Sequence, residues 1–284
     1  MKKHYNIFDA HCDTLSLIAD GTAAEKCAVT AAGIAGYDSY TQMFACFIAP
    51  CHRERAMDRF IRIADLFDGI DMGCGKLLSI EGAEMIRNVE DVDLLHSRGV
   101  RCIALTWNDT NALAGGADDP GAGLTPLGKS VIRRMEELGI TVDVSHLNDR
   151  SFYDVMSVVS LPVIATHSNS RAVCCHRRNL TDEMFSLIRE SGGAAGINLY
   201  PPFLTGTNEA CAADAARHIL HWLEIGGGDA VGIGADFDGT DGLLPHDIRG
   251  CGELYRLFDE LAALGVSETE IEAITHINFE KVLV

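Results

Sequence analysis

The chain has 284 residues, of which 47% are hydrophobic, enough to form one substantial core. Its 41 acidic and 23 basic side chains leave a net charge of −18, which repels nucleic-acid phosphates and anionic lipid headgroups. No stretch approaches the roughly 18 apolar residues that a membrane span needs, and no apolar leader precedes the first expected strand. We therefore expect a cytoplasmic protein with neither a nucleic-acid nor a membrane partner.

Ten cysteines are scattered along the chain without a C-x-x-C pair. Several of them lie inside apolar segments, where cysteine behaves as a small hydrophobic residue. This distribution indicates reduced thiols rather than a disulfide framework. The adjacent Cys174 and Cys175 are interpreted in the same way, and not as a redox device.

Short apolar segments alternate with amphipathic ones along the chain, which predicts strands separated by helices. Strands are expected at residues 6–13, 43–49, 77–80, 102–106, 141–145, 163–166, 194–200 and 231–235. Helices are expected at residues 14–20, 53–67, 91–97, 125–138, 149–159, 181–190, 209–225, 252–264 and 267–276. Two connections are long: residues 21–40 are rich in Ala, Gly and Thr, and residues 109–123 are a candidate lid over a site.

Alternation of strands and helices without a break in composition predicts parallel βα units in one α/β domain over residues 1–284. A (β/α)8 barrel of the TIM type fits eight strands best. A doubly wound open sheet is the alternative, but it needs no eighth strand and usually opens with a glycine-rich phosphate turn. The sequence GIGAD at 232–236 lies near the other end of the chain, so a dinucleotide site is not expected.

Histidines and carboxylates follow five of the expected strands at the point where each strand ends. Residues two apart on a strand face the same way, which places the first two of them on one face. Each of the others alone has an ordinary explanation as a core histidine, a helix cap or a turn residue. In a barrel, however, all of these strand ends meet at the C-terminal face, where active sites lie. The six residues are His11, Asp13, Glu81, His146, His167 and Asp236.

Imidazole and carboxylate groups are suitable ligands for zinc or a similar first-row ion. Six ligands are too many for one tetrahedral ion and indicate a two-metal site with a bridging carboxylate. Glu81 is the candidate bridge because its strand lies between the first strand and the later histidines. Two metals activate a shared water for attack on an amide carbonyl, and Asp236 is the candidate proton shuttle.

Arg177 and Arg178 lie just beyond the sixth expected strand. Two adjacent arginines before a helix are commonly solvated. One of them pointing inward would instead bind a substrate carboxylate through two parallel hydrogen bonds.

Several segments together resemble one known family, and they occur in that family's order over nearly the whole chain. They are FDAHCDTL, SIEGAE, VDVSHLND, THSNSRAVCCHRRN, GIGADFDG and NFEKVL. The chain resembles the membrane (renal) dipeptidase family of zinc peptidases, in the amidohydrolase superfamily. The resemblance implies two zinc ions per chain, bridged by Glu81. The remaining ligands that it implies are His11 with Asp13 for one ion, and His146 with His167 for the other.

The resemblance further implies that Asp236 transfers the proton and that Arg178 binds the carboxylate of a small dipeptide substrate. Members of the family cleave dipeptides, often tolerate a D-residue on the C-terminal side, and in some cases open β-lactams or dimerise. This chain has Trp107 where many members have a histidine that helps to bind the scissile carbonyl. We therefore expect Trp107 and Asn108 to contact substrate, with oxyanion support from Asn108 or from the metals alone.

Three hypotheses follow for the function. The first is a zinc-dependent dipeptidase. The second keeps the metals but changes the substrate to another amide, a lactam, a lactone or an N-acyl amino acid. The third is a non-catalytic barrel that binds a metal or a peptide, although buried carboxylates without a cation would be costly. Because members of the family often dimerise, the resemblance also implies that two chains could pair as a homodimer.

Overall fold

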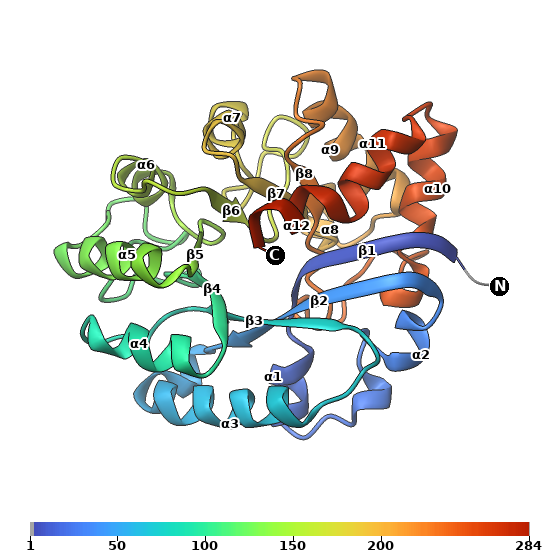
Figure 1. Cartoon of the computed structure of the whole chain (residues 1–284). Helices are drawn as coiled ribbons and strands as arrows, with labels where there is room; N and C mark the ends of the chain where they lie inside the picture. The colour runs from blue at the N-terminus through green and yellow to red at the C-terminus, as the bar shows by residue number, and fades with distance from the viewer. Residues whose placement is uncertain (1–2, 284) are drawn as a thin grey trace.

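The computed structural model describes residues 3–283, in which eight parallel strands close into a barrel in the order β1 to β8 (Figure 1). The strands are β1 (Lys3–Cys12), β2 (Tyr37–Phe47), β3 (Gly75–Glu81), β4 (Val100–Ala104), β5 (Thr141–Asp143), β6 (Val163–Ala165), β7 (Ala194–Ile197) and β8 (Val231–Ile233). Because β8 pairs with β1 at Ile233 and Asp9, the sheet has no open edge. The predicted (β/α)8 barrel is confirmed, and the open doubly wound sheet is excluded.

Helices surround the barrel (Figure 1). They are α1 (Thr14–Ala19), α2 (Ala31–Ile34), α3 (Ala56–Gly69), α4 (Glu90–Ser97), α5 (Pro126–Leu138), α6 (Asp149–Met156), α7 (Asp182–Glu190), α8 (Pro201–Leu204), α9 (Ala212–Glu224), α10 (Tyr255–Ala263), α11 (Glu268–Glu272) and α12 (Asn278–Leu283). Three 3₁₀ turns, η1 (Ala24–Lys26), η2 (Pro50–Arg55) and η3 (Cys251–Glu253), and one π-helical turn, η4 (Ala273–Ile277), complete the described elements. The α11, η4 and α12 segments form one continuous helical stretch that closes the chain.

Helix ends follow local capping chemistry. The side chains of Thr125, Asn148 and Thr181 each accept a hydrogen bond from a backbone N–H in the first turn of α5, α6 and α7, respectively. Gly139 ends α5 in the left-handed conformation, with φ of 70°. The sequence predicts helix ends at these same residues, so the local capping signals agree with the fold.

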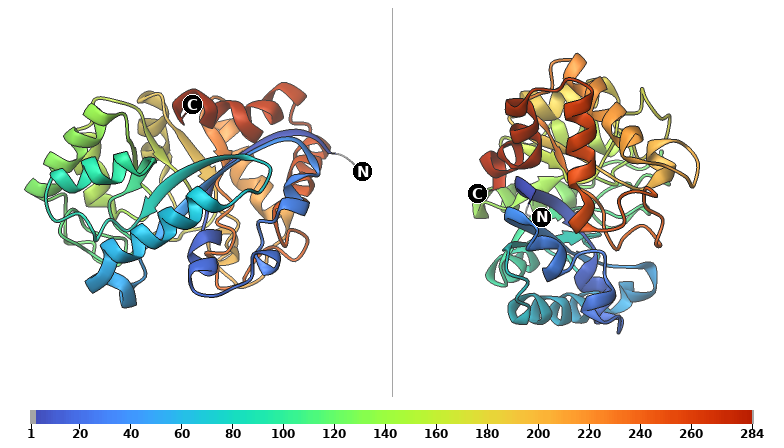
Figure 2. Two further views of the ribbon diagram at one scale, coloured as in Figure 1. Left: turned by 60° about the horizontal axis from the view of Figure 1, so that its bottom comes forward. Right: turned by 90° about the vertical axis from the view of Figure 1, so that its right-hand side faces the viewer.

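The first two strands differ most from expectation. The β1 and β2 strands are longer than expected and extend beyond the barrel as a curved pair toward the N-terminus (Figure 2). Pairing of Lys3 with Tyr37 begins this extension, so the excursion expected at 21–40 is shorter.

Each of the strands from β4 to β8 ends before the residue expected to end it, and β7 ends at Ile197 rather than at Tyr200. At β5 the cause is a side chain: Oδ1 of Asp143 accepts hydrogen bonds from the backbone N–H groups of Ser145 (2.8 Å) and Thr166 (3.0 Å). Asp9 does the same for His11 (3.3 Å) and Ala235 (2.9 Å) where β1 meets β8. Buried carboxylates thus accept the backbone hydrogen bonds that the sheet would otherwise make at the C-terminal mouth. The chain can therefore leave the strand there, and its side chains line the mouth.

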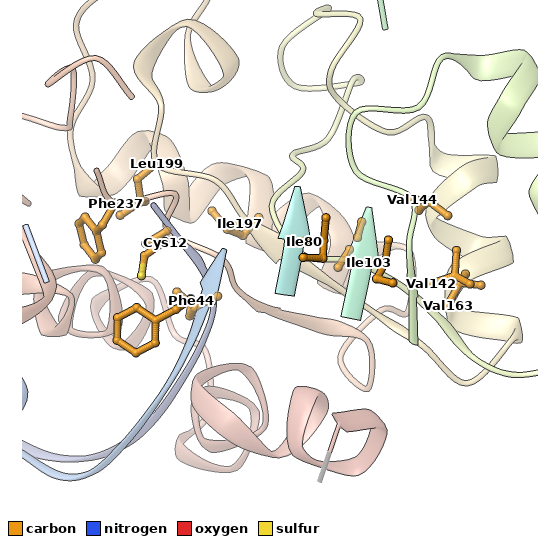
Figure 3. Packing of buried hydrophobic residues seen from close by; sticks show 14 of the residues in the cluster. Cys12, Phe44, Ile80, Ile103, Val142, Val144, Val163, Ile197, Leu199 and Phe237 are labelled. Atoms are coloured by element: carbon orange, nitrogen blue, oxygen red, sulfur yellow. The ribbon is translucent and has the colours of Figure 1, made fainter. Parts of the chain in front are cut away.

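Most of the apolar core lies between the strands and the surrounding helices. Figure 3 shows Ile80, Ile103, Val142 and Val163 following one another from strand to strand, and each of them is paired in register with the next. A second, smaller cluster draws residues from β1, β2, β4, β6 and β7, so its members meet inside the barrel. The ring of Phe279 on α12 joins this inner cluster and stacks on Phe8, with 5.8 Å between ring centroids.

Two expectations from composition can be compared with the structure. All ten cysteines lie among the described residues, where each is a free thiol. Of the helices in residues 3–283, none has the length and apolar character needed to cross a bilayer.

Candidate active site

The six residues that follow the strand ends meet at the C-terminal mouth of the barrel. They are buried, with exposed fractions between 1% and 8%. Their nitrogen and oxygen atoms form three overlapping groups, each with its ligand atoms within 4.8 Å of one another. The groups are His11 with Asp13 and Glu81, Glu81 with His146 and His167, and His11 with His167 and Asp236.

Glu81 lies between two sets of ligands. Its Oε1 atom is 2.7 Å from Nε2 of His146 and 3.8 Å from Nε2 of His167. Its Oε2 atom is 3.4 Å from Nε2 of His11, which is itself 3.8 Å from Oδ2 of Asp13. One carboxylate therefore presents each of its oxygens to a different set, which is the geometry of a bridging ligand.

Asp13 reaches this cluster by a different route from the simple strand alternation expected. The register of β1 shifts between Asp9 and Cys12, and Asp13 already occupies the N-cap position of α1. Its backbone N–H donates to the carbonyl of Phe237 at 2.8 Å, which fixes the strand-to-helix turn. Asp13 and His11 thus converge because the strand ends irregularly between them.

The backbone at the mouth adopts conformations that are uncommon for residues with side chains. His146 and Asp236 have φ of 68° and 60°, in the left-handed region. Such conformations cluster at functional sites, where the surrounding structure holds them in place. Gly239 is required for a steric reason, because a Cβ there would lie 2.3 Å from both Oδ2 of Asp13 and Oδ1 of Asp236.

Neighbouring side chains determine which nitrogen of each histidine faces the cluster. Oδ1 of Asn108 lies 2.8 Å from Nδ1 of His146 and can only accept there, so Nδ1 carries the proton. Thr166 donates its hydroxyl hydrogen to Asp143 at 2.5 Å and therefore accepts from Nδ1 of His167 at 2.8 Å. Both Nε2 atoms are left as lone pairs directed at the cluster, as a metal ligand requires.

Burial dominates the electrostatics of the acidic groups. It raises the pKa of Asp236 to about 7 and that of Asp13 to about 6. Burial acts on Glu81 in the same direction, but the neighbouring His11 and His146 hold the pKa of its carboxyl below the ordinary value.

The histidines separate into two kinds. Burial lowers the pKa of His146 to about 4, with a further contribution from the charge of Arg178, and it lowers the pKa of His167. Burial opposes protonation of His11 as well, but the carboxylates of Glu81 and Asp13 raise its pKa well above the ordinary value.

Three atoms at the centre of the cluster test whether it fits a cation. Nε2 of His11, Oδ1 of Asp13 and Oε2 of Glu81 are buried and have no hydrogen-bond partner among residues 3–283. Leaving such groups desolvated and unpaired is costly, whereas a divalent cation would satisfy all three. The nitrogen and carboxylate donors match a borderline first-row ion, so the residues present fit a metal site.

Of the two adjacent arginines, only Arg178 points inward. It is 5% exposed, and within the described chain its Nε and Nη2 atoms have no hydrogen-bond partner. Burial lowers its pKa to about 10, and its guanidinium carbon lies 5.6 Å from the ring centroid of Phe203. Arg177 is exposed and pairs with Asp118 at 2.5 Å. The buried guanidinium is thus a donor group without an acceptor, beside the cluster.

Trp107 and Asn108 follow β4 and face the same mouth. The ring centroid of Trp107 is 5.3 Å from that of Phe47 and 6.1 Å from that of His146. Trp107 therefore lies beside the cluster without displacing a ligand. The side-chain oxygen of Asn108 is already engaged by His146, which leaves only its Nδ2 group for other contacts.

The loop at 109–123, expected as a candidate lid, has a buried and well-connected middle. Ala117 donates its backbone N–H to the carbonyl of His146 at 2.8 Å. Gly115 donates to Oγ of Ser151 at 2.9 Å. Residues 113–117 of this loop thus form a packed wall of the site, while Thr110, Ala112 and residues 118–121 are exposed.

The sequence interpretation named no site residue from the seventh strand, yet the structure places one there. Asn198 directly follows β7, and its Nδ2 donates to Oδ2 of Asp236 at 2.9 Å. Its position repeats the signal used elsewhere, a polar side chain immediately after an apolar strand. The strand expected at 194–200 contains Asn198, so the sequence could identify it only with a shorter seventh strand and with the same signal applied to amides.

Comparison with known proteins agrees with this geometry. The family model "Membrane dipeptidase (Peptidase family M19)" matches residues 55–284. An uncharacterized protein from the pqqA 5′ region of Klebsiella pneumoniae is 34% identical over 204 residues, which are 68% of this chain and 74% of that protein. An uncharacterized dipeptidase of Schizosaccharomyces pombe is 30% identical over 239 residues, 79% of this chain, so the chain spans only 56% of that relative's length.

Among solved structures, a metallopeptidase from Rhodobacter sphaeroides has 25% sequence identity and a TM-score of 0.88, covering 99% of both chains. That protein was crystallised with a phosphinate mimic of the dipeptide L-Ala-D-Ala. The matched family, the shared fold and the buried His/Glu/Asp cluster point the same way. The chain belongs to peptidase family M19, the membrane dipeptidase family.

Proposed function

We propose that this protein is a dipeptidase that holds two divalent cations, zinc in the first instance, and hydrolyses the peptide bond of dipeptides. The observation that carries the proposal is the buried guanidinium of Arg178, whose Nε and Nη2 lack hydrogen-bond partners among the described residues, beside a cluster in which three metal-ligand atoms also lack them. A substrate with a free carboxylate would provide acceptors for the Arg178 donors, and a pair of cations would bind the ligand atoms of the cluster.

The distances suggest how the ligands divide. His11 and Asp13 would hold one ion, and His146 and His167 the other, with Glu81 contributing one oxygen to each. Two ions there would lower the pKa of a water that they share and polarise the scissile carbonyl.

Asp236 is proposed as the group that takes the proton from the attacking water and returns it to the leaving amine. Its Oδ1 atom lies 3.8 Å from Nε2 of His11, inside the cluster, while Asn198 holds its Oδ2 atom. Burial raises the pKa of Asp236 to about 7, so the carboxyl can accept and release a proton near neutral pH.

Arg178 is proposed to bind the carboxylate of the C-terminal residue through a charge-assisted, bidentate contact. The Rhodobacter sphaeroides relative binds a mimic of L-Ala-D-Ala, which supports extending the substrate range to dipeptides with a D-residue at that end. Trp107 would form part of the wall around the N-terminal residue. The scissile carbonyl would rely on the ions, and on Nδ2 of Asn108, in place of the histidine found in many family members.

The test is an assay of a panel of L,L- and L,D-dipeptides after removal of metal by a chelator and again after zinc is added back. We expect no hydrolysis in the chelated protein and recovery with zinc, at about two ions per chain. Absence of zinc-dependent release of amino acids from every dipeptide would reject the proposal.

Arg178→Ala separates a dipeptidase from an enzyme that acts on another amide, a lactam or a lactone. The kcat/KM for dipeptides should fall by about a hundredfold or more, because a charged, desolvated contact is lost. Hydrolysis of a substrate without a free carboxylate should be unaffected. Equal loss on both kinds of substrate would favour the second class of function.

A further inference from the structure

The guanidinium of Arg178 is positioned by its own backbone and by the ring of Phe203, whose centroid lies 5.6 Å from the guanidinium carbon. Its side chain makes no hydrogen bond through Nε or Nη2 to the described residues, so these atoms do not fix its direction. It lies in the segment between β6 and α7, which returns on itself where Ser170 bridges to Leu180. Anything that holds the neighbouring peptides therefore aims the guanidinium.

Arg171 holds the peptide unit immediately before Arg178 and the one that follows Asn179. Its Nε atom donates to the carbonyl of Asn179 at 2.8 Å, and its Nη2 atom donates to the carbonyl of Arg177 at 3.2 Å. These two carbonyls belong to the residues immediately before and after Arg178. A single planar guanidinium thus contacts the chain on both sides of the residue proposed to bind substrate.

Arg171 is itself fixed at its other edge. Its Nη1 and Nη2 atoms donate to the two carboxylate oxygens of Asp149 at 2.7 and 2.8 Å. Asp149 is the first residue of α6, which follows the loop that carries His146. The pair thereby links the Arg178 segment to the part of the barrel mouth that supplies a metal ligand.

The segment has other ties that account for its folding. Nδ2 of Asn179 donates to the carbonyls of Cys174 (2.8 Å) and Phe203 (2.9 Å), and Leu180 donates to Asn169 at 2.8 Å. An ion pair with a half-exposed carboxylate adds little to stability by itself. What Arg171 adds to these ties is the orientation of the peptides around Arg178.

We propose that Arg171, anchored by Asp149, is a positioning residue that aims Arg178 at the substrate carboxylate and so sets affinity for substrates with a free C-terminus. This inference rests on the proposed function, because it assigns Arg178 the role of carboxylate ligand. Arg171 acts only through Arg178 and touches neither substrate nor metal. A misdirected guanidinium weakens a contact made in both the ground state and the transition state, so KM changes and kcat does not.

The test is a double-mutant cycle between Arg171→Ala and Arg178→Ala, measured as KM and kcat on dipeptides and on the same dipeptides with an amidated C-terminus. We expect Arg171→Ala to raise KM for free dipeptides roughly tenfold with little change in kcat, and to leave the amides unaffected. In the Arg178→Ala background the same substitution should have no effect, because nothing remains to be aimed. Additive losses in the cycle would overturn the proposal, as would an unchanged KM in Arg171→Ala.

Arg171→Lys distinguishes positioning from simple charge pairing. A lysine keeps a positive charge beside Asp149 but lacks the planar fork that reaches both carbonyls, so KM should stay raised. Full recovery by lysine would contradict the proposal. Arg189→Ala is the matched control. Arg189 lies on α7 and forms an exposed ion pair with Asp229 at 2.5 Å, so its removal should leave KM unchanged.

A separate measurement keeps the inference independent of turnover. Calorimetric titration with D-alanine, a free amino acid, reports carboxylate binding in the wild type and the Arg171 variants. If no dipeptide is hydrolysed, the proposed function fails, while weaker D-alanine binding in Arg171→Ala that disappears in the Arg178→Ala background still supports the positioning role. Equal D-alanine affinity in wild type and Arg171→Ala overturns it. Thermal unfolding of each variant verifies that the barrel remains folded.

Discussion

Oδ1 of Asn108 lies 2.8 Å from Nδ1 of His146, although the two residues come from different strand ends and are separated by 38 positions. Since an amide oxygen can only accept, the contact fixes the proton on Nδ1 and directs the lone pair of Nε2 at Glu81 and His167. Asn108 therefore supports a residue that we propose as a metal ligand.

Asn108→Ala should weaken metal binding by about 10- to 100-fold, because the imidazole loses the partner that fixes its tautomer and orientation. Competition with a chromophoric chelator measures this affinity. Asn108→Asp keeps an acceptor at the same place and serves as the control, with affinity close to wild type. Equal affinity in wild type and Asn108→Ala would show that His146 needs no such support.

Metal binding should strengthen as pH rises. In the metal-free protein, burial raises the pKa of Asp236 to about 7 and that of Asp13 to about 6, and His11 also has a raised pKa. A cation must displace these protons, whereas His146, with a pKa lowered by burial to about 4, is already neutral. The metal-bound state therefore holds fewer protons than the metal-free state, so affinity increases through pH 6 and 7 and continues to rise until His11 has also lost its proton.

The zinc-induced rise in Tm is accordingly expected to grow from about pH 5.5 to about pH 8. Calorimetry in buffers of different ionisation enthalpy should detect proton release at pH 6. Asp236→Asn removes the carboxyl whose pKa burial raises to about 7, and should flatten this dependence around pH 7. A zinc-induced Tm rise of the same size at every pH would contradict the assignment.

Gly239→Ala tests the packing of the mouth. A methyl group there would lie 2.3 Å from Oδ2 of Asp13 and from Oδ1 of Asp236, so both carboxylates must move. We expect metal affinity to fall by at least about tenfold, since ligand positions are displaced. Gly69→Ala is the control, because nothing lies within 4 Å of the added carbon. Similar metal affinity in both variants would mean that the carboxylates adapt without loss.

The primary cluster could be predicted because its signal is local. Each of His146, His167 and Asp236 comes shortly after an apolar strand, and parallel strands bring their C-terminal ends to one face. The supporting residues carry no comparable local signal. The hydroxyl of Thr166 donates to Asp143, which lies 23 positions earlier, and accepts from Nδ1 of His167. Such contacts form only after the strands have paired.

The direction in which each side chain points could not be predicted from the sequence either. Arg177 and Arg178 are chemically identical neighbours, and only the folded segment exposes the first and buries the second. The sequence assigns Asp13 to the site, but the position of its side chain depends on a register shift in β1 that no residue pattern predicts. Residue type and periodicity predict which groups gather, whereas hydrogen bonds across strands determine how they point.

Helix α12, drawn in dark red in Figure 1, lies against β1, β7 and β8. Its Phe279 side chain fills the interior of the barrel at that end. It is 1% exposed, stacks on Phe8, and fits against the bare backbone of Gly232, where an added Cβ would lie 2.4 Å from the ring. Phe279→Ala would leave a cavity in the inner cluster, beside Phe8 and Gly232. We expect the free energy of unfolding to fall by about 3–5 kcal/mol, measured by urea denaturation.

Metal affinity of the folded Phe279→Ala variant should nevertheless remain close to wild type at low temperature, since none of the ligands belongs to the inner cluster. Leu264→Ala, at a position that is 49% exposed, is the control and should change stability by less than about 0.5 kcal/mol. A loss below about 1 kcal/mol in Phe279→Ala would show that α12 is not needed to complete the core. Loss of metal binding without loss of stability would instead mean that the inner cluster sets the geometry of the mouth directly, through the strands that the two share.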